Sequence, residues 1–282
     1  MPFGKGYRPD PDIVRQRRPK FHLFRSKLGV GPLPSSTNNR AKLAASAGGP
    51  GILNQWQTGS CEGHAHASGV TLRFALMGQP IPLASPIAAY QGALVLQRGT
   101  NPDGTLPPLQ DTGTEPSLVI QSLQQWGIAS AASWGNYPAD PSTICNEPTL
   151  SQLESAREFE LSGAYFLESA GDQFCYDLMS ALAAGYPCTG AIAASSNAFQ
   201  NYTGGVLGAL DNDIDHATLW IDYIGFDGSN LSSVTFIGVN SWSEDWGESD
   251  APGISGGMYR CNADFVRKYY QDCAVLDVRK VA

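Results

Sequence analysis

The first strong periodic pattern of the chain begins at Cys61. Small and apolar residues return at four- and three-residue intervals, at Ala65, Gly69, Leu72 and Leu76. This spacing places them on one face of a helix, with Cys61 at the helix N-terminus. The first turns are rich in glycine, alanine and serine, which lets neighbouring backbone approach closely. The pattern therefore predicts a helix wedged between two other parts of the fold.

Two further helices are predicted from their boundary signals and apolar faces. The second has Thr114 as its cap and Pro116 in its first turn, and Gly127 ends it. The third covers residues 172–185 and cannot continue past Pro187. The apolar faces consist of Val119, Leu123 and Trp126 in the second helix and of Phe174, Leu178 and Leu182 in the third.

The chain beyond the third helix alternates with the two-residue period of β-strands. Segments 217–223 and 234–239 show this most clearly. Residues 29–51, by contrast, are rich in turn-forming residues, so we expect an extended lead-in there. Helices that come first and strands that come later favour an α+β fold with a helical lobe and a β lobe.

Charge is unevenly distributed along the chain. The 282 residues carry a net charge of −8, but residues 1–42 carry +8 and residues 43–282 therefore carry −16. A basic arm thus precedes an acidic body. Basic arms often bind nucleic acid, yet no folded nucleic-acid-binding module accompanies this one. We expect the arm to dock on the acidic body of its own chain or on a partner, and we expect no nucleic-acid partner.

The composition fits a globular chain without a membrane anchor. The chain is 42% hydrophobic, which is enough for a substantial core. No window approaches the roughly 20 apolar residues of a membrane span, and the first residues lack the apolar core of a secretion signal. No membrane partner is expected. The compartment stays open between the cytoplasm and export by a non-standard route.

The six cysteines contain no C-x-x-C pair, so no metal and no cofactor is expected. If one cysteine is a free nucleophile, five remain, and an odd number cannot form a complete disulfide framework. We interpret five of the six as small buried hydrophobic residues. These five are Cys145, Cys175, Cys188, Cys261 and Cys273.

The neighbours of Cys61 set it apart. A thiol is a useful nucleophile only as a thiolate, and a helix N-terminus beside an imidazolium lowers its pKa. Gln55 lies six residues upstream and offers an amide that can hold an oxyanion together with the Cys61 N–H. His216 opens one apolar strand and Asn240 ends another. An asparagine can accept the imidazole N–H and fix its tautomer, and Trp242 can cover that bond.

The chain resembles the papain (C1) family of cysteine peptidases, in pattern most closely its bacterial members, over residues 33–275. The motifs that carry the resemblance are Gln55, Gly59-Ser60-Cys61, His216-Ala217, Asn240-Ser241-Trp242 and Trp246-Gly247. The resemblance implies a papain-like two-lobed α+β fold, with the cleft between a helical lobe and a β-barrel lobe. It also implies hydrolysis of peptide substrates through a Cys61 thioester, with His216 as general base and acid and Asn240 orienting it.

The resemblance also suggests a division of the chain. Residues 1–32 are predicted to form a basic arm, which is either a propeptide-like segment or a docking segment. Residues 33–282 are predicted to form the catalytic domain. Its helical lobe covers roughly residues 55–160 and its β lobe roughly residues 161–275. In papain relatives an N-terminal segment commonly runs through the cleft in a non-productive direction, as in a zymogen. We therefore expect residues 10–30 along the cleft, with a brace behind the β lobe or docking on a neighbouring subunit as alternatives.

Gly113, Asp215 and Trp242 are the substrate-binding candidates. Gly113 lies where the family has a glycine in its substrate-binding segment, and Asp215 and Trp242 adjoin the predicted base and its partner. One departure from the family pattern is Glu62, which follows the nucleophile where plant and animal members have tryptophan. Another is Thr58, which replaces a cysteine of the family's usual first disulfide.

Three classes of function stay open. A cysteine endopeptidase is favoured by the complete set of motifs. The second class is a papain-like fold used as a structural or binding subunit, for example in a phage particle or a secreted assembly. The third is a thioester acyltransferase.

Overall fold

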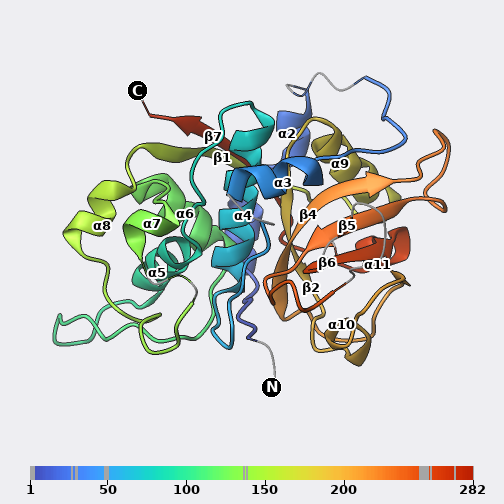
Figure 1. Ribbon diagram of the computed structural model, residues 1–282. Coiled ribbons are helices and arrows are strands. Elements are labelled where there is room, and N and C mark those ends of the chain that lie inside the picture. The colour runs from blue at the N-terminus through green and yellow to red at the C-terminus, as the bar shows by residue number, and fades with distance from the viewer. Residues whose placement is uncertain are drawn as a thin grey trace.

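The computed structural model describes residues 4–26, 28, 31–47, 51–135, 137, 139–247, 254, 256–269 and 271–281. Figure 1 shows a group of helices on one side, strands with a few helices on the other, and the helix α4 (Cys61–Leu76) between them. No helix in the described ranges is long and apolar enough to cross a membrane.

The three predicted helices are present. The first is α4, the second is α6 (Pro116–Trp126) and the third is α9 (Asp172–Ala183). Gly127 ends α6 in a conformation with φ of +93°, which glycine adopts without the steric penalty of a side chain. The other helices are α1 (Asp12–Arg17), α2 (Phe21–Arg25), α3 (Arg40–Ala47), α5 (Pro86–Gln97), α7 (Ala131–Trp134), α8 (Leu150–Ser155), α10 (Asn197–Gln200) and α11 (Ala263–Lys268).

The strands of the described residues form one sheet in the order β1-β7-β2-β4-β5-β6-β3. All neighbours are antiparallel except β3 and β6. The two predicted strands correspond to β4, which begins with His216, and β5. The bounds are β1 (Phe159–Phe166), β2 (Cys188–Ile192), β3 (Val206–Leu207), β4 (His216–Ile224), β5 (Thr235–Val239), β6 (Met258–Asn262) and β7 (Ala274–Lys280).

Two expectations about secondary structure were wrong. The lead-in over residues 29–51 contains the helix α3, and the region expected to be only β-structure contains α10 and α11. These helices have four to eight residues. Such lengths span about one or two turns, too few for a 3.6-residue period to be visible in the sequence.

Helix α4 is buried along most of its length, because α5 and the sheet pack on it. Its glycines make this close approach possible. A Cβ at Gly63 would lie 2.4 Å from the carbonyl oxygen of Pro86, and a Cβ at Gly69 would lie 3.0 Å from Leu276 Cδ1 of β7. The small residues of the first turns therefore hold the helix at the seam between the helical side and the sheet, with Cys61 at its first position.

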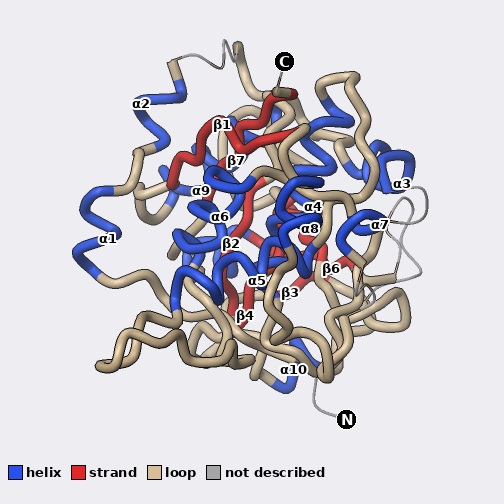
Figure 2. The backbone as a smooth tube through the Cα atoms, turned by 90° about the vertical axis from the view of Figure 1, so that its left-hand side faces the viewer, coloured by secondary structure: helices blue, strands red, loops and turns tan. Residues whose placement is uncertain are grey.

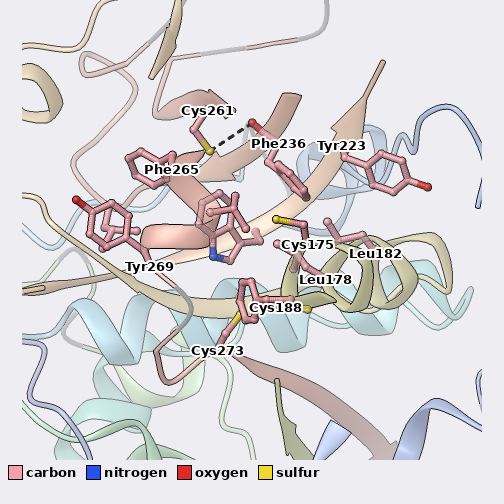
Figure 3. Packing of buried hydrophobic residues seen from close by; sticks show 14 of the residues in the cluster. Cys175, Leu178, Leu182, Cys188, Tyr223, Phe236, Cys261, Phe265, Tyr269 and Cys273 are labelled. Atoms are coloured by element: carbon pink, nitrogen blue, oxygen red, sulfur yellow. Dashed lines mark hydrogen bonds between the residues drawn. The ribbon is translucent and has the colours of Figure 1, made fainter. Parts of the chain in front are cut away.

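The largest core packs one face of the sheet against α9 and α11 (Figure 3). Cys175, Cys188, Cys261 and Cys273 lie in it among aromatic and aliphatic residues, fully buried and free. Their interpretation as small hydrophobic residues is confirmed. Cys145 is also free and is half-buried.

The basic arm lies along the body. Figure 2 shows α1 and α2 on one flank of the molecule. Lys20 forms a parallel bridge with Phe166 of β1, and the ring of Phe24 stacks on Tyr165 with 4.2 Å between centroids. Apolar anchors therefore hold residues 20–25 against the edge strand β1.

Candidate active site

Cys61 is the first residue of α4, and its side chain is fully buried. It belongs to a small buried cluster with Ala65, Ala191, Ala217 and Tyr7 of the arm, and it forms a hydrogen bond with the backbone of Ala217. Ala217 is the second residue of β4. This contact therefore places the thiol beside the strand end that begins with His216.

The imidazole of His216 is held by Asn240. Nε2 lies 2.7 Å from Asn240 Oδ1, and the same oxygen accepts the backbone N–H of Ser241 at 2.8 Å. The Trp242 ring lies against the imidazole, with 4.8 Å between the two centroids. Nδ1 of His216 is buried and has no hydrogen-bond partner among the described residues. Because Asn240 Oδ1 can only accept, it fixes the proton on Nε2 and leaves Nδ1 with a free lone pair.

Gln55 is fully buried next to this pair. Its Oε1 accepts the Ser241 hydroxyl at 2.5 Å, and its Nε2 donates to the Thr58 carbonyl at 2.9 Å. The backbone N–H of Gln55 donates to the Ser241 carbonyl at 2.9 Å. Through Ser241, the segment that carries Gln55 and the segment that carries Asn240 are therefore fixed to each other.

Both titratable groups are neutral near pH 7 in this state. Burial raises the pKa of the Cys61 thiol far above its usual range, Glu62 raises it further, and hydrogen bonds with the backbone of Ala217, Gly6 and Glu62 only partly oppose this. Burial lowers the pKa of His216 to about 4, against the effect of its Asn240 hydrogen bond. A neutral thiol is a poor nucleophile, since the reactive form of a cysteine is the thiolate.

A second group of polar side chains lies on α4 just after Cys61. Glu62 is buried with a raised pKa, mainly because of desolvation, and its Oε2 lies 3.2 Å from His66 Nδ1. His64 Nδ1 contacts the Ser60 carbonyl at 2.9 Å, and burial lowers the His64 pKa to about 4. Both histidines are packed residues of the helix. In the described ranges, no cluster of His, Cys, Asp or Glu could hold a metal ion.

A hydrogen-bond network joins the loop before Cys61 to the Gly113 segment. Asp111 accepts the Gly59 N–H at 2.8 Å and the Tyr90 hydroxyl at 2.6 Å. The Tyr90 oxygen in turn accepts the Gly113 N–H at 3.0 Å. Gly113 has φ of +73°, a conformation that favours glycine. The network fixes two backbone segments on the helical side of Cys61.

All three substrate-binding candidates contact the arm. The Gly6 carbonyl lies so close to Gly113 that a Cβ there would meet it at 2.1 Å. Asp215 forms an ion pair of 3.1 Å with Lys5, and Trp242 Nε1 donates to the Gly4 carbonyl at 3.1 Å. Residues 4–7 therefore lie along the line of predicted functional residues, and Cys61 is covered where they cross it.

The expected position of the arm needs a correction. Residues 10–30 were expected in the cleft, but the segment at Cys61 is residues 4–8. The Thr114 N–H donates to the Gly6 carbonyl at 2.8 Å, and the Arg8 N–H donates to the Thr114 carbonyl at 3.0 Å, in a parallel bridge. The described residues from 10 to 25 instead pack against β1, α9 and Asp272. Residues 4–8 contain two glycines, Gly4 and Gly6, and they lie so close to the body that a Cβ at Gly4 would meet the Thr58 carbonyl oxygen at 2.3 Å and one at Gly6 the Gly59 carbonyl oxygen at 1.9 Å.

The sequence analysis missed Asp272 and Tyr7. Tyr7 lies among glycines in the arm, and Asp272 precedes the last strand. Their hydroxyl–carboxylate contact joins residues 265 positions apart. No local pattern signals such a contact.

The comparisons with known proteins agree with this arrangement. Residues 113–263, more than half of the chain, match the family described as papain family cysteine protease. The fold is similar to that of xylellain, a cysteine protease from Xylella fastidiosa, with a TM-score of 0.71 and 19% identity over 99% of this chain and 97% of that one.

Two further structures show the same fold. For proCathepsin B from Trypanosoma congolense the TM-score is 0.66 and the identity 15%, over 99% of this chain and 86% of that one. For a cysteine protease of Carica candamarcensis in complex with E-64 the values are 0.62 and 21%, over 86% and 98%. The predicted papain-like α+β fold is confirmed, and the chain belongs to the papain family of cysteine proteases.

Proposed function

We propose that this protein is a cysteine endopeptidase with Cys61 as nucleophile, His216 as general base and acid, and Asn240 as the residue that orients the imidazole. The observation that carries the proposal is the fixed imidazole. Asn240 holds Nε2 at 2.7 Å, while Nδ1 has no described partner. The base nitrogen is thereby kept free at the strand end that packs on Cys61.

The reaction follows from these positions. His216 Nδ1 takes the proton of the Cys61 thiol, and the sulfur attacks the carbonyl carbon of the scissile peptide bond. Negative charge develops on the carbonyl oxygen, where the Gln55 amide and the Cys61 N–H act as donors. His216 then gives its proton to the leaving amine, and a thioester remains. Water, deprotonated by His216, hydrolyses the thioester and restores the thiol.

The basic arm keeps this site closed in our proposal. Residues 4–8 contact Gly113, Asp215 and Trp242 and bury Cys61. Burial is also the main cause of the raised thiol pKa and of the lowered His216 pKa. Removing the arm lets water reach both groups, so the two pKa values approach those needed for a thiolate–imidazolium pair. Residues 1–32 are thus an inhibitory segment on a catalytic domain that covers residues 33–282.

Labelling with a thiol-reactive epoxide peptide, read by intact mass, tests the nucleophile. The proposal expects one adduct, mapped to Cys61, and no adduct on Cys61→Ala at the same dose. His216→Ala should react much more slowly because the thiol loses its base. First labelling at Cys145, the half-buried cysteine, would contradict the assignment. Labelling at Cys61 without hydrolysis of any peptide would favour the binding-subunit function.

A further inference from the structure

A buried imidazole contacts the peptide group that carries the Cys61 N–H. His64 is fully buried on α4, three residues after Cys61. Its Nδ1 lies 2.9 Å from the carbonyl oxygen of Ser60. This carbonyl and the Cys61 N–H belong to one planar peptide unit, in which they point in opposite directions. A side chain that fixes the carbonyl therefore also fixes the direction of the N–H.

Two hydroxyl groups determine where the proton of the imidazole lies. The Gln55 carbonyl can only accept, so the Thr58 hydroxyl donates to it at 2.7 Å. The Thr58 oxygen then accepts the Ser60 hydroxyl at 2.6 Å. With its proton directed to Thr58, the Ser60 hydroxyl oxygen can only accept from His64 Nδ1, which lies 3.2 Å away. Both Ser60 oxygens near Nδ1 are thus acceptors, and Nδ1 carries the proton.

The charge state of His64 agrees with a single proton on the ring. Burial lowers the pKa of His64 to about 4, and the backbone of Ser60 and Asn54 only partly opposes this. The ring is therefore neutral near pH 7. Its Nε2 has no hydrogen-bond partner among the described residues. A proton on Nε2 would be a buried donor without an acceptor, which is costly.

The same side chains join the two donors of the proposed oxyanion site. Gln55 Nε2 donates to the Thr58 carbonyl at 2.9 Å, which uses one amide proton and leaves the second for a substrate oxygen. The side chains of Gln55, Thr58, Ser60 and His64 are all fully buried. Hydrogen bonds in such a chain polarise one another. A donor on the Ser60 carbonyl therefore both orients the Cys61 N–H and strengthens it as a donor.

We propose that His64 is a positioning residue for peptide hydrolysis, which holds the Ser60–Cys61 peptide group so that the Cys61 N–H meets the oxyanion of the transition state. The inference rests on the proposed peptidase function and adds a residue to it. The backbone N–H of His64 also donates to the Ser60 carbonyl, at 3.0 Å. Replacing the ring thus leaves this buried acceptor paired, and variants at position 64 should fold.

Two variants and a matched control test the role of the ring. His64→Leu removes the donor, so kcat should fall by roughly tenfold with KM unchanged, less than the ~10²–10³-fold loss of a whole oxyanion donor. His64→Asn places an amide nitrogen near the Nδ1 position and should keep most of kcat. The control is His66→Leu. His66 Nδ1 lies 2.8 Å from the Glu62 carbonyl in the same four-residue relation, but that peptide carries the Gly63 N–H.

Alkylation separates the oxyanion site from the thiol. Iodoacetamide forms a bond between sulfur and a saturated carbon and releases iodide, so no oxyanion develops. Its rate with Cys61 also reports opening of the arm. His64→Leu should leave this rate unchanged while hydrolysis falls, whereas His66→Leu, beside Glu62, should change both rates in the same proportion or neither. A parallel fall of both rates in His64→Leu would mean a merely structural role and would overturn the proposal.

The protonated nitrogen of His64 can be read from NMR of the full chain with ¹⁵N-labelled histidine. The chain has four histidines, and the signals that His64→Leu removes are those of His64. Correlations of the ring protons with both nitrogens should show the proton on Nδ1. This measurement depends neither on a variant that folds nor on activity. A proton on Nε2 would overturn the proposal.

A peptide aldehyde tests the oxyanion site without turnover. The Cys61 sulfur bonds to the aldehyde carbon and the thiol proton goes to the aldehyde oxygen, so a reversible hemithioacetal forms. Protection of Cys61 from iodoacetamide, read by intact mass, gives the affinity. His64→Leu should bind roughly tenfold more weakly than the wild type, and His64→Asn nearly as tightly.

The outcomes separate this inference from the peptidase function. Equal aldehyde affinities of the wild type and His64→Leu would overturn the role of His64 even if peptides are hydrolysed. A weaker affinity in His64→Leu, with no hydrolysis of any peptide by the wild type, would support the positioning role and refute the peptidase function. A wild type that binds no aldehyde would overturn both.

Discussion

The orientation of the Asn240 amide determines which nitrogen of His216 carries the proton. The Ser241 N–H donates to Asn240 Oδ1, so the amide oxygen is turned toward His216 Nε2. The amide itself is buried. An acceptor at Nε2 stabilises the imidazolium that forms when Nδ1 takes a proton. In the proposed mechanism, Asn240 therefore acts on the reaction through the imidazole, as a positioning residue.

Asn240→Ala should reduce peptide hydrolysis without abolishing it. The base and the nucleophile remain, but the imidazole loses its fixed tautomer, so we expect kcat to fall by about 10²-fold with little change in KM. Steady-state kinetics on one peptide substrate measures this. Asn230→Ala, in an exposed loop, is the control and should leave kcat unchanged. A loss as complete as that of His216→Ala would contradict a purely orienting role.

Glu62→Gln should lower the pKa of the Cys61 thiol. Glu62 is the charged group that raises this pKa, second only to burial, and glutamine keeps the size of the side chain without its charge. The pH at which Cys61 becomes reactive toward iodoacetamide should therefore move downward. The measurement uses a chain loosened by Arg18→Ala, so that the thiol is accessible. Glu154→Gln, on the exposed face of α8, is the control and should leave this pH unchanged. An upward shift of this pH in Glu62→Gln would contradict the effect assigned to the Glu62 charge.

For single residues, the sequence indicated the candidate site residues by their local context, but it could not indicate their long-range partners. Gln55, Cys61, His216 and Asn240 each adjoin a turn or an element end that is visible in the sequence, and the structure brings these segments to one seam. Asp272 has no comparable local signal. Its role depends on contacts with an arm more than 250 positions away.

Helix α4 shows how a single element fixes the distance between the two sides of the fold. Gly63 faces backbone of α5, whereas Gly69 faces the ends of the Leu276 and Leu219 side chains. Backbone cannot move away from an added methyl group without displacing the whole helix, but a leucine side chain can adjust its rotamer.

Gly63→Ala and Gly69→Ala should therefore differ in stability, although both gain helix propensity. The Gly63 methyl group would meet the Pro86 carbonyl oxygen at 2.4 Å, so we expect a loss of about 1–3 kcal/mol in the free energy of unfolding. At Gly69 the gain of up to about 1 kcal/mol from alanine should offset most of the crowding. Urea denaturation of both variants compares them directly. A Gly69→Ala variant less stable than Gly63→Ala would refute this account of α4.

Secondary structure was predictable where a long period and an end signal coincide. Helix α6 could be recognised in the sequence because a proline begins it and a glycine follows it. Its eleven residues are also enough to show the helical period of the apolar positions. The helices α3, α10 and α11 are too short for this, and they form because tertiary contacts or caps stabilise them. Asn262, for instance, caps α11 by accepting the Phe265 N–H at 3.0 Å.

Over the whole molecule, the charge asymmetry of the sequence becomes an internal interface. Cations of the arm pair with carboxylates of the body, as Lys5 does with Asp215 and Arg25 with Asp177. Most such pairs are partly exposed and individually contribute little to stability. Arg18 is different. It is 8% exposed and bridges the buried carboxylates of Asp10 and Asp272, with its guanidinium 3.9 Å from the centroid of the Phe166 ring.

Arg18→Ala should release the arm from the active site. It leaves two buried carboxylates without their shared cation, a loss that typically costs about 3–5 kcal/mol. That cost falls on the closed state, because in the open state water solvates both carboxylates. The open population, and with it the rate of Cys61 alkylation, should therefore rise by roughly 10²-fold or more. Arg17→Ala removes the same charge from an exposed neighbour and should leave the rate unchanged. Circular dichroism checks that both variants keep the fold, and equal alkylation rates in the two would show that Arg18 does not hold the arm closed.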